Sequence, residues 1–133
     1  MATKVLLAED DIDDQQIFLD FLKDRKDLQL MTVVENGVVL METLETITED
    51  ALLPDIIILD QNMPKRNGLQ TLELLKAHER YAHIPVMVYS TYADHQLLSS
   101  CSKMGATAVY TKPITKAEYN KMLDAFLNMA FTS

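Results

Sequence analysis

The stretch from Asp55 to Gly68, with the sequence DIIILDQNMPKRNG, constrains the fold of this chain more than any other. Three isoleucines and a leucine run without a break into Asp60, and Pro64 follows four residues later. A short, β-branched, unbroken apolar run indicates a strand buried on both faces, as in a parallel sheet covered by helices. An acid directly after such a run lies where open α/β sheets place their ligands. Aspartate is also common in turns, so this stretch alone leaves open whether Asp60 only ends a strand.

Four further short apolar runs indicate strands, and helix signals follow each of the five runs. The other strands are expected at Lys4–Ala8, Leu28–Val34, Ile84–Tyr89 and Thr107–Thr111. The helices are expected over about Asp13–Arg25 and from Asn36-Gly37, Asn67-Gly68, Asp94 and a Thr115–Glu118 capping box, with a loop over Thr48–Pro54. Their predicted apolar stripes include Ile17 and Phe18, Val39 and Leu40, and Leu97, Leu98 and Cys101. The alternation predicts an α/β fold, a doubly wound five-stranded parallel sheet of the flavodoxin-like type with order 2-1-3-4-5.

The size and charge of the chain exclude several classes of protein. Its 133 residues fit one domain, and no linker or second domain is visible. Acids outnumber bases 20 to 12, and the net charge of −8 disfavours nonspecific binding to nucleic acid or to an anionic membrane. No window offers the ~18 apolar residues of a membrane span, and the acidic N-terminus does not fit a signal peptide. The single cysteine, Cys101, favours a reducing compartment, so we expect a cytoplasmic protein.

Acidic residues follow the first and third predicted strands. In the order 2-1-3-4-5 these strands are neighbours, so Glu9 and Asp10 are expected to converge with Asp60. At an effective dielectric of about 20, two unit charges ~4 Å apart repel by roughly 4 kcal/mol, so such a cluster must hold a proton, a cation or both. Oxygen ligands favour a hard ion, Mg²⁺ rather than zinc. Asp13 and Asp14, further along, are explained as acids that complement the dipole of the next helix.

Ser90 follows the fourth strand and Lys112 the fifth, and both are expected at the same edge of the sheet. A carboxylate, a divalent cation, an ammonium and a hydroxyl together are suited to phosphoryl transfer, with the carboxylate of Asp60 as nucleophile. The chain has no GxxxxGK[ST] or GxGxxG motif, so ATP is not expected as a direct substrate.

In this arrangement the sequence resembles the receiver domain of two-component response regulators over nearly the whole chain. The residues that carry the resemblance all follow strands, namely Glu9-Asp10, Asp60 with Met63-Pro64 and Gly68 behind it, Ser90, and Lys112-Pro113. The resemblance implies a single, stand-alone receiver domain over residues 1–133 without an output domain. The Ser-Thr pair and the long segment before Asp55 are more similar to regulators paired with phytochrome-like histidine kinases.

The resemblance implies that Asp60 accepts a phosphoryl group from a phosphohistidine on a sensor histidine kinase or phosphotransfer protein. Mg²⁺ would be bound by the side chains of Asp10 and Asp60, by the backbone carbonyl of Asn62, and by Glu9 through a water. No enzymatic activity is expected beyond self-catalysed phosphotransfer and autodephosphorylation. The implied output is a change in contacts with an unidentified downstream protein, or a homodimer, through the face of the fourth helix, fifth strand and fifth helix.

Ser90 and Lys112 are implied to bind the phosphoryl oxygens, and the Lys112-Pro113 bond is expected to be cis. Thr91 stands where the family often has a smaller residue, so it is expected to narrow access to the phosphoryl site. Tyr92 is expected near the approach of water, where it would slow hydrolysis.

The family's switch aromatic falls at Val109, and the nearest ring is Tyr110. One step along a strand reverses the face of the sheet, so this ring cannot simply take the place of the missing one.

Three other classes of function compete with a phosphorylation switch. A binding module that no longer uses phosphorylation would not need mutually repelling acids. An aspartate-based phosphatase would need a second acid at the position of Asn62. A flavodoxin would need a hydroxyl- or glycine-rich phosphate loop where Glu9 and Asp10 stand.

Overall fold

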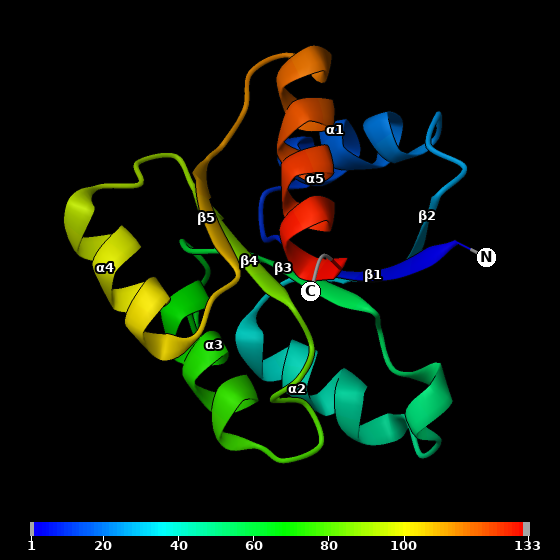
Figure 1. The fold of residues 1–133 in the computed structure, drawn as a ribbon, viewed down its shortest axis with the longest axis vertical. Coiled ribbons are helices and arrows are strands. Elements are labelled where there is room, and N and C mark those ends of the chain that lie inside the picture. Colours follow the sequence, from blue (N-terminus) through cyan, green and yellow to red (C-terminus); the bar gives the residue numbers. More distant parts are fainter. Residues whose placement is uncertain (1, 132–133) are drawn as a thin grey trace.

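The computed structural model describes residues 2–131, which form a five-stranded parallel sheet with helices on both faces (Figure 1). The strands are β1 (Thr3–Ala8), β2 (Leu28–Val34), β3 (Ile56–Asp60), β4 (Val86–Ser90) and β5 (Ala108–Thr111). They lie in the order β2-β1-β3-β4-β5, and every neighbouring pair is parallel. The predicted doubly wound, flavodoxin-like fold and its strand order are confirmed.

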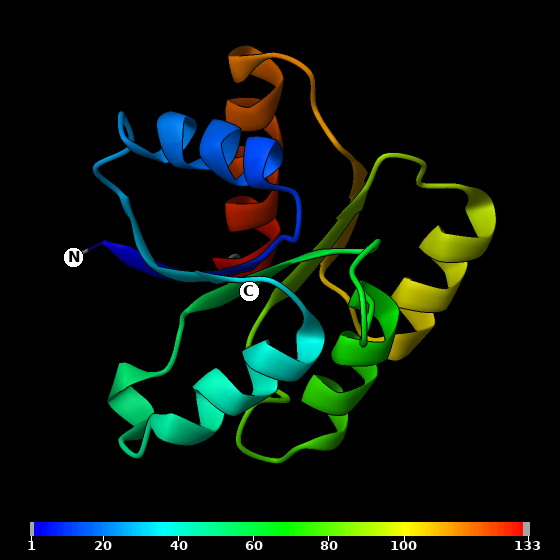
Figure 2. The ribbon, with the colours of Figure 1, turned by 180° about the vertical axis from the view of Figure 1, so that it is seen from behind.

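Helices connect successive strands and complete the layers. Within residues 2–131 they are α1 (Ile12–Leu22), α2 (Gly37–Thr46), α3 (Gly68–Ala77), α4 (His95–Met104) and α5 (Lys116–Phe131), with a 3₁₀ turn, η1 (Asp50–Leu52). Helices α1 and α5 cover one face of the sheet, and α2, α3 and α4 cover the other, as the two opposite views show (Figures 1 and 2). A side chain that accepts a hydrogen bond from the first turn begins each of the five α-helices, namely Asp11, Asn36, Asn67, Asp94 and Thr115.

The unbroken apolar run of β3 reflects burial on both faces of the sheet. Ile56 and Ile58 pack among the side chains of α1 and α5, whereas Ile57 and Leu59 pack among those of α2, α3 and α4. All four are fully buried. Because burying such a side chain stabilises the fold by roughly 1.5–3 kcal/mol, a central strand covered on both faces has no position for a polar residue until it ends. Asp60 is therefore held at a defined place by apolar packing behind it.

Some predicted details are wrong. Val39, Ile17 and Leu98 belong to predicted core-facing stripes, yet each is exposed, because the stripe of each helix that contacts the sheet is narrower than helical spacing alone indicates. Their neighbours Leu40, Phe18 and Cys101 are fully buried. Helix α1 ends at Leu22 rather than near Arg25, and the predicted loop over Thr48–Pro54 contains η1. Within residues 2–131, no helix combines the length and apolar character that crossing a membrane requires.

Candidate functional site

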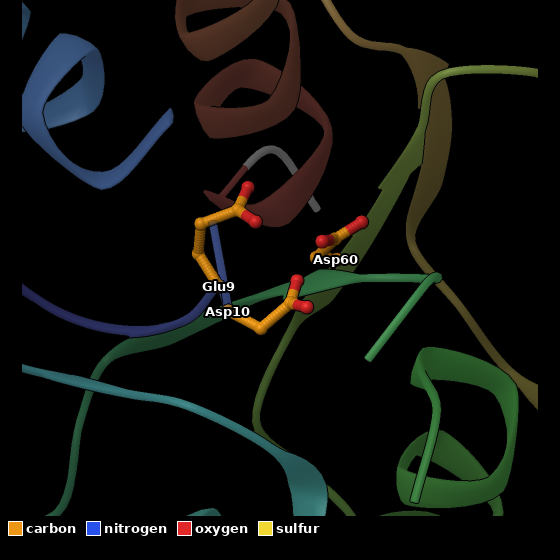
Figure 3. A group of neighbouring side chains, drawn as sticks. All are labelled: Glu9, Asp10 and Asp60. Atoms are coloured by element: carbon orange, nitrogen blue, oxygen red, sulfur yellow. The ribbon is translucent and has the colours of Figure 1, made fainter. Parts of the chain in front are cut away.

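Three acidic side chains meet at the carboxyl ends of β1 and β3. Glu9 and Asp10 directly follow β1, and Asp60 is the last residue of β3. One carboxylate oxygen from each lies within 4.8 Å of those of the other two, and Figure 3 shows the three side chains converging beside the strand ends. Glu9 and Asp60 are buried whereas Asp10 is exposed. The predicted convergence of these three side chains is confirmed, and Asp10 lies on the side of the cluster that faces solvent.

Lys112 places its ammonium among these acids. Its Nζ lies 3.3 Å from Asp60 Oδ2 and 3.1 Å from Glu9 Oε1, and it donates to Asp14 Oδ2 at 2.9 Å. Burial by itself lowers the pKa of the Lys112 ammonium, but the hydrogen bond and charges of the three carboxylates outweigh it and raise this pKa. The ammonium therefore stays protonated and supplies the one positive charge that the structure places beside the cluster among the described residues.

The ionisation of Asp60 is strongly perturbed by its surroundings. Burial and the neighbouring Glu9 carboxylate raise the pKa of Asp60 to about 8, against the opposing effects of Lys112 and of the Asn62 N–H. That backbone N–H donates to Asp60 Oδ1 at 3.2 Å. Without a cation, Asp60 thus carries a proton at neutral pH, in agreement with the expectation that the cluster holds a proton, a cation or both.

A buried tyrosine fixes the orientation of Glu9, and the sequence interpretation missed it. The Tyr89 hydroxyl donates to Glu9 Oε1 at 2.6 Å, and the Asp11 N–H donates to Glu9 Oε2 at 3.2 Å. Burial and the Glu9 carboxylate raise the pKa of Tyr89 well above its usual value, so the phenol keeps its proton and remains a donor. A signal existed, because a hydroxyl-bearing ring next to Ser90 in an otherwise apolar strand needs a hydrogen-bond partner when buried.

Asp14 was also missed as a contact of the site. It was interpreted only as an acid of the first helical turn, yet its carboxylate contacts Lys112, 98 positions along the chain. The helix dipole accounts for an acid at this position equally well. The sequence therefore offers no signal that distinguishes the two roles.

Ser90 ends β4 beside the cluster, buried at 2% exposure. Its Oγ accepts hydrogen bonds from Asn62 Nδ2 and from the Tyr92 N–H, both at 3.3 Å. Thr91 and Tyr92 follow on the surface, and the Tyr92 side chain is 77% exposed. The predicted effects of Thr91 on access to the phosphoryl site and of Tyr92 on hydrolysis stay predictions.

The loop after β3 requires glycine at position 68. A Cβ on Gly68 would lie 2.9 Å from the carbonyl oxygen of Asp60 and 3.0 Å from Gln61 Cα, both backbone atoms that cannot move aside cheaply. The Gly68 N–H donates to the Gln61 carbonyl at 3.1 Å, and the Leu69 N–H donates to Gln61 Oε1 at 2.8 Å. This close approach of α3 to the end of β3 holds the segment that carries Asn62.

Two expectations that concern β5 have different outcomes. The cis bond expected between Lys112 and Pro113 is wrong, since the described residues contain no cis peptide bond. The trans form of a prolyl bond is favoured by about 0.5–1 kcal/mol, and Lys112 reaches its carboxylates with that form. The prediction that Val109 and Tyr110 lie on opposite faces of the sheet is confirmed. Val109 packs against the apolar core under α2, α3 and α4, whereas Tyr110 packs against the apolar core under α1 and α5.

Comparison with known proteins identifies the class to which this fold and site belong. The model of the response regulator receiver domain matches residues 5–124, so the chain belongs to this family. The chain is 30% identical over 123 residues to the "Probable C4-dicarboxylate response regulator DctR" of Bacillus subtilis, an alignment that covers 92% of this chain and 51% of DctR. It thus spans about half the length of DctR, and its alignments with two other curated relatives cover 34% and 15% of their lengths.

Two solved structures share the fold. The phosphorylated cyanobacterial phytochrome response regulator RcpA has a TM-score of 0.82 at 23% identity, over 99% of this chain and 96% of RcpA. The receiver domain of the sensor histidine kinase PA1611 from Pseudomonas aeruginosa has a TM-score of 0.76 at 20% identity, over 96% of this chain and 99% of that one. The PA1611 domain was solved with a magnesium ion coordinated in its active site cleft.

Proposed function

We propose that the chain is a phosphoacceptor response regulator. In this proposal Asp60 takes a phosphoryl group from a phosphohistidine on a histidine kinase or phosphotransfer protein in an Mg²⁺-dependent reaction, and the phosphorylated state changes protein–protein contacts. The observation that carries the proposal is a buried carboxylate at the end of the central strand with an ammonium 3.3 Å away and two further carboxylates within 4.8 Å. Membership of the receiver family supports it, because receiver domains interact with these two kinds of partner.

The donor set fits magnesium. It consists of oxygen atoms alone, from three carboxylates of which two are buried, and burial leaves their mutual repulsion poorly screened. Glu9, Asp10 and Asp60 would hold the ion, together with the backbone carbonyl of Asn62. When bound, Mg²⁺ supplies positive charge that offsets the negative charge of the phosphoryl oxygens.

The protein's own groups have separate roles in the proposed transfer. The ionised Asp60 carboxylate attacks phosphorus, so that an O–P bond forms while the P–N bond to the donor imidazole breaks, and the imidazole leaves with the electron pair of that bond. The ammonium of Lys112 stabilises the charge on the phosphoryl oxygens. Ser90 Oγ, which accepts two hydrogen bonds in the structure, turns its own proton toward a phosphoryl oxygen. Thr91 narrows the entrance to the phosphoryl oxygens.

The phosphorylated state is proposed to signal through the face formed by α4, β5 and α5. Ser90 ends β4 and Lys112 follows the adjacent parallel strand β5, and the Lys112 N–H donates to the Ser90 carbonyl at 2.8 Å. A displacement of one residue therefore displaces the other. A partly apolar groove of about 490 Å³ lies on this face, lined by residues that include Tyr110, Pro113 and Ile114. A downstream protein or a second copy of the chain would bind there. The stand-alone, single-domain organisation of residues 1–133 stays a prediction, as does the pairing with a phytochrome-like kinase.

A receiver-like module that signals without phosphorylation is the alternative. It is favoured by one observation, the half-buried Val109 at the position where the family has its switch aromatic, with Tyr110 on the opposite face. In that case the acids would bind a cation without accepting a phosphoryl group.

Acetyl phosphate with Mg²⁺, followed by intact mass measurement, tests the proposal. The native chain should gain the mass of one phosphoryl group, and Asp60→Asn should gain none. Asp13→Asn removes the same charge from an exposed position on α1 and should be phosphorylated like the native chain. A chelator should prevent phosphorylation of the native chain and of Asp13→Asn. A native chain that stays folded, binds Mg²⁺ and gains no mass would support the non-phosphorylated module instead.

A further inference from the structure

Asp14 makes the shortest contact of the Lys112 ammonium. Its Oδ2 accepts from Lys112 Nζ at 2.9 Å, whereas the Glu9 and Asp60 oxygens lie 3.1 and 3.3 Å from the same nitrogen. The Lys112 side chain is 13% exposed and that of Asp14 is 30% exposed, so water screens this pair only in part. Asp14 lies outside the three-acid cluster that fits a metal ion.

The start of α1 places Asp14 firmly. Asp11 caps the helix, and its Oδ1 accepts from the Asp14 N–H at 3.0 Å. One residue on, Gln15 Nε2 donates to the Glu9 carbonyl at 2.5 Å, which ties α1 to the end of β1. These contacts fix the backbone of Asp14 relative to the acidic cluster, and from this position its carboxylate reaches the Lys112 ammonium.

We propose that Asp14 is a positioning residue that keeps the Lys112 ammonium beside Asp60 when the charge at Asp60 changes. The inference rests on the proposed function and extends it. Once a cation or a phosphoryl group occupies the oxygens of Glu9 and Asp60, the attraction of these carboxylates for the Lys112 ammonium changes. The flexible four-carbon stem of the lysine would then gain conformational entropy by moving into water. Asp14 takes no part in either event, so its hydrogen bond persists and retains the ammonium at the reacting oxygens.

Electrostatic repulsion by Asp14 would have the opposite effect on the rate of phosphorylation. Asp14 adds a negative charge near the site where a negatively charged phosphoryl group arrives. If repulsion dominated, Asp14→Asn would accelerate phosphorylation. If positioning dominates, the same change slows it, and the loss depends on the presence of Lys112.

The first experiment is a double-mutant cycle of phosphorylation rates with acetyl phosphate and Mg²⁺. Asp14→Asn should lower the rate constant about tenfold in the native background, and less than about twofold when Lys112 is replaced by methionine, because the interaction it removes is then already absent. Asp13→Asn, the same change one position earlier on an exposed side chain, should alter the rate less than about twofold. An unchanged or faster rate for Asp14→Asn overturns the inference, as does an equal loss in both backgrounds.

The second experiment needs no phosphorylation. Side-chain ammonium NMR of ¹⁵N-labelled protein should show a slowly exchanging signal for Lys112 in the native chain with Mg²⁺, and exchange at least about fivefold faster in Asp14→Asn. If the Lys112 ammonium protons exchange at the same rate in Asp14→Asn as in the native chain, the inference is overturned, even where the native chain is phosphorylated. A native chain that takes no phosphoryl group refutes the proposed function, and the NMR comparison still decides whether Asp14 holds Lys112.

Discussion

Replacing Asp60 with asparagine should stabilise the protein against unfolding in the absence of Mg²⁺. Asp60 is buried, yet one of its neighbours within 4.8 Å is another buried carboxylate, that of Glu9. Asparagine has nearly the same shape, carries no charge and keeps an oxygen that can accept from the Asn62 N–H. The substitution therefore removes the burial cost and the repulsion without creating a cavity.

The magnitude follows from the distances. At an effective dielectric of about 20, Lys112 at 3.3 Å attracts an ionised Asp60 by about 5 kcal/mol, and Glu9 at up to 4.8 Å repels it by about 3.5 kcal/mol or more. Asp10 is exposed and adds about 1 kcal/mol of repulsion. These charge terms nearly cancel, so the penalty for burying the carboxylate, several kcal/mol per ion, decides the sign. The shift of the Asp60 pKa from about 3.9 to about 8 corresponds to about 5 kcal/mol at pH 7.5, and the buried amide has a penalty of its own of about 1–3 kcal/mol, so the expected gain at that pH is about 2–4 kcal/mol.

The gain should depend on pH in a defined direction. The pKa of Asp60 is raised to about 8 in the folded state, whereas in an unfolded chain it is about 3.9. Between these values the folded protein keeps a proton that the unfolded chain releases, so the native free energy of unfolding falls as pH rises through this window. Asp60→Asn lacks this loss, so its advantage should be largest above about pH 8 and should disappear as pH falls toward about 4.

Urea denaturation with a chelator, from pH 4 to 8.5, measures this. Asp13→Asn serves as control and should lie within about 0.5 kcal/mol of the native chain at every pH. With Mg²⁺ at about 100 times its dissociation constant, the native chain should gain about 2.7 kcal/mol and the advantage of Asp60→Asn should shrink or reverse. If Asp60→Asn is clearly less stable than the native chain in the chelator at pH 7.5, attraction by Lys112 outweighs burial and repulsion at Asp60, and the reasoning is refuted.

Three further predictions concern the same edge of the sheet. Mg²⁺ should raise the melting temperature of the native chain, because it binds the folded state, and calorimetry of Asp10→Ala should show that this rise is lost. Tyr89→Phe should lower the free energy of unfolding by about 1–3 kcal/mol in urea melts, since the buried Glu9 carboxylate loses a hydrogen-bond donor at 2.6 Å. The control Tyr110→Phe, at a half-buried ring, should change the free energy of unfolding by less than about 0.5 kcal/mol. Gly68→Ala should cost about 1–3 kcal/mol by the same measurement, because its Cβ would meet backbone atoms at 2.9 and 3.0 Å; an unchanged stability would mean that the loop relaxes freely.

Local patterns in the amino-acid sequence are enough to locate the strands and helices and the edge of the sheet at which the strands end. Unbroken apolar runs identify strands buried on both faces, and capping residues such as Asn36, Asn67 and Asp94 mark where helices begin. Because parallel strands in this order bring their carboxyl ends to one edge, a residue that directly follows a strand has a predictable place. Glu9 and Asp60 were located in this way, and nothing beyond local pattern and a topology rule was needed.

The side chains that complete the site are set by the packing of elements that are far apart in the sequence. Asp14 contacts Lys112 across 98 positions of the chain, and Tyr89 contacts Glu9 across 80. The Asp14 contact depends on how far α1 is rotated against the sheet, and the Tyr89 contact depends on which rotamer fills the space between the ends of β1 and β4. The rotation of another helix, α2, leaves Val39 exposed where helical spacing predicts burial. Periodicity fixes the face of an element to within about a residue, whereas a hydrogen bond forms only when two atoms lie about 3 Å apart, so these partners emerge from packing alone.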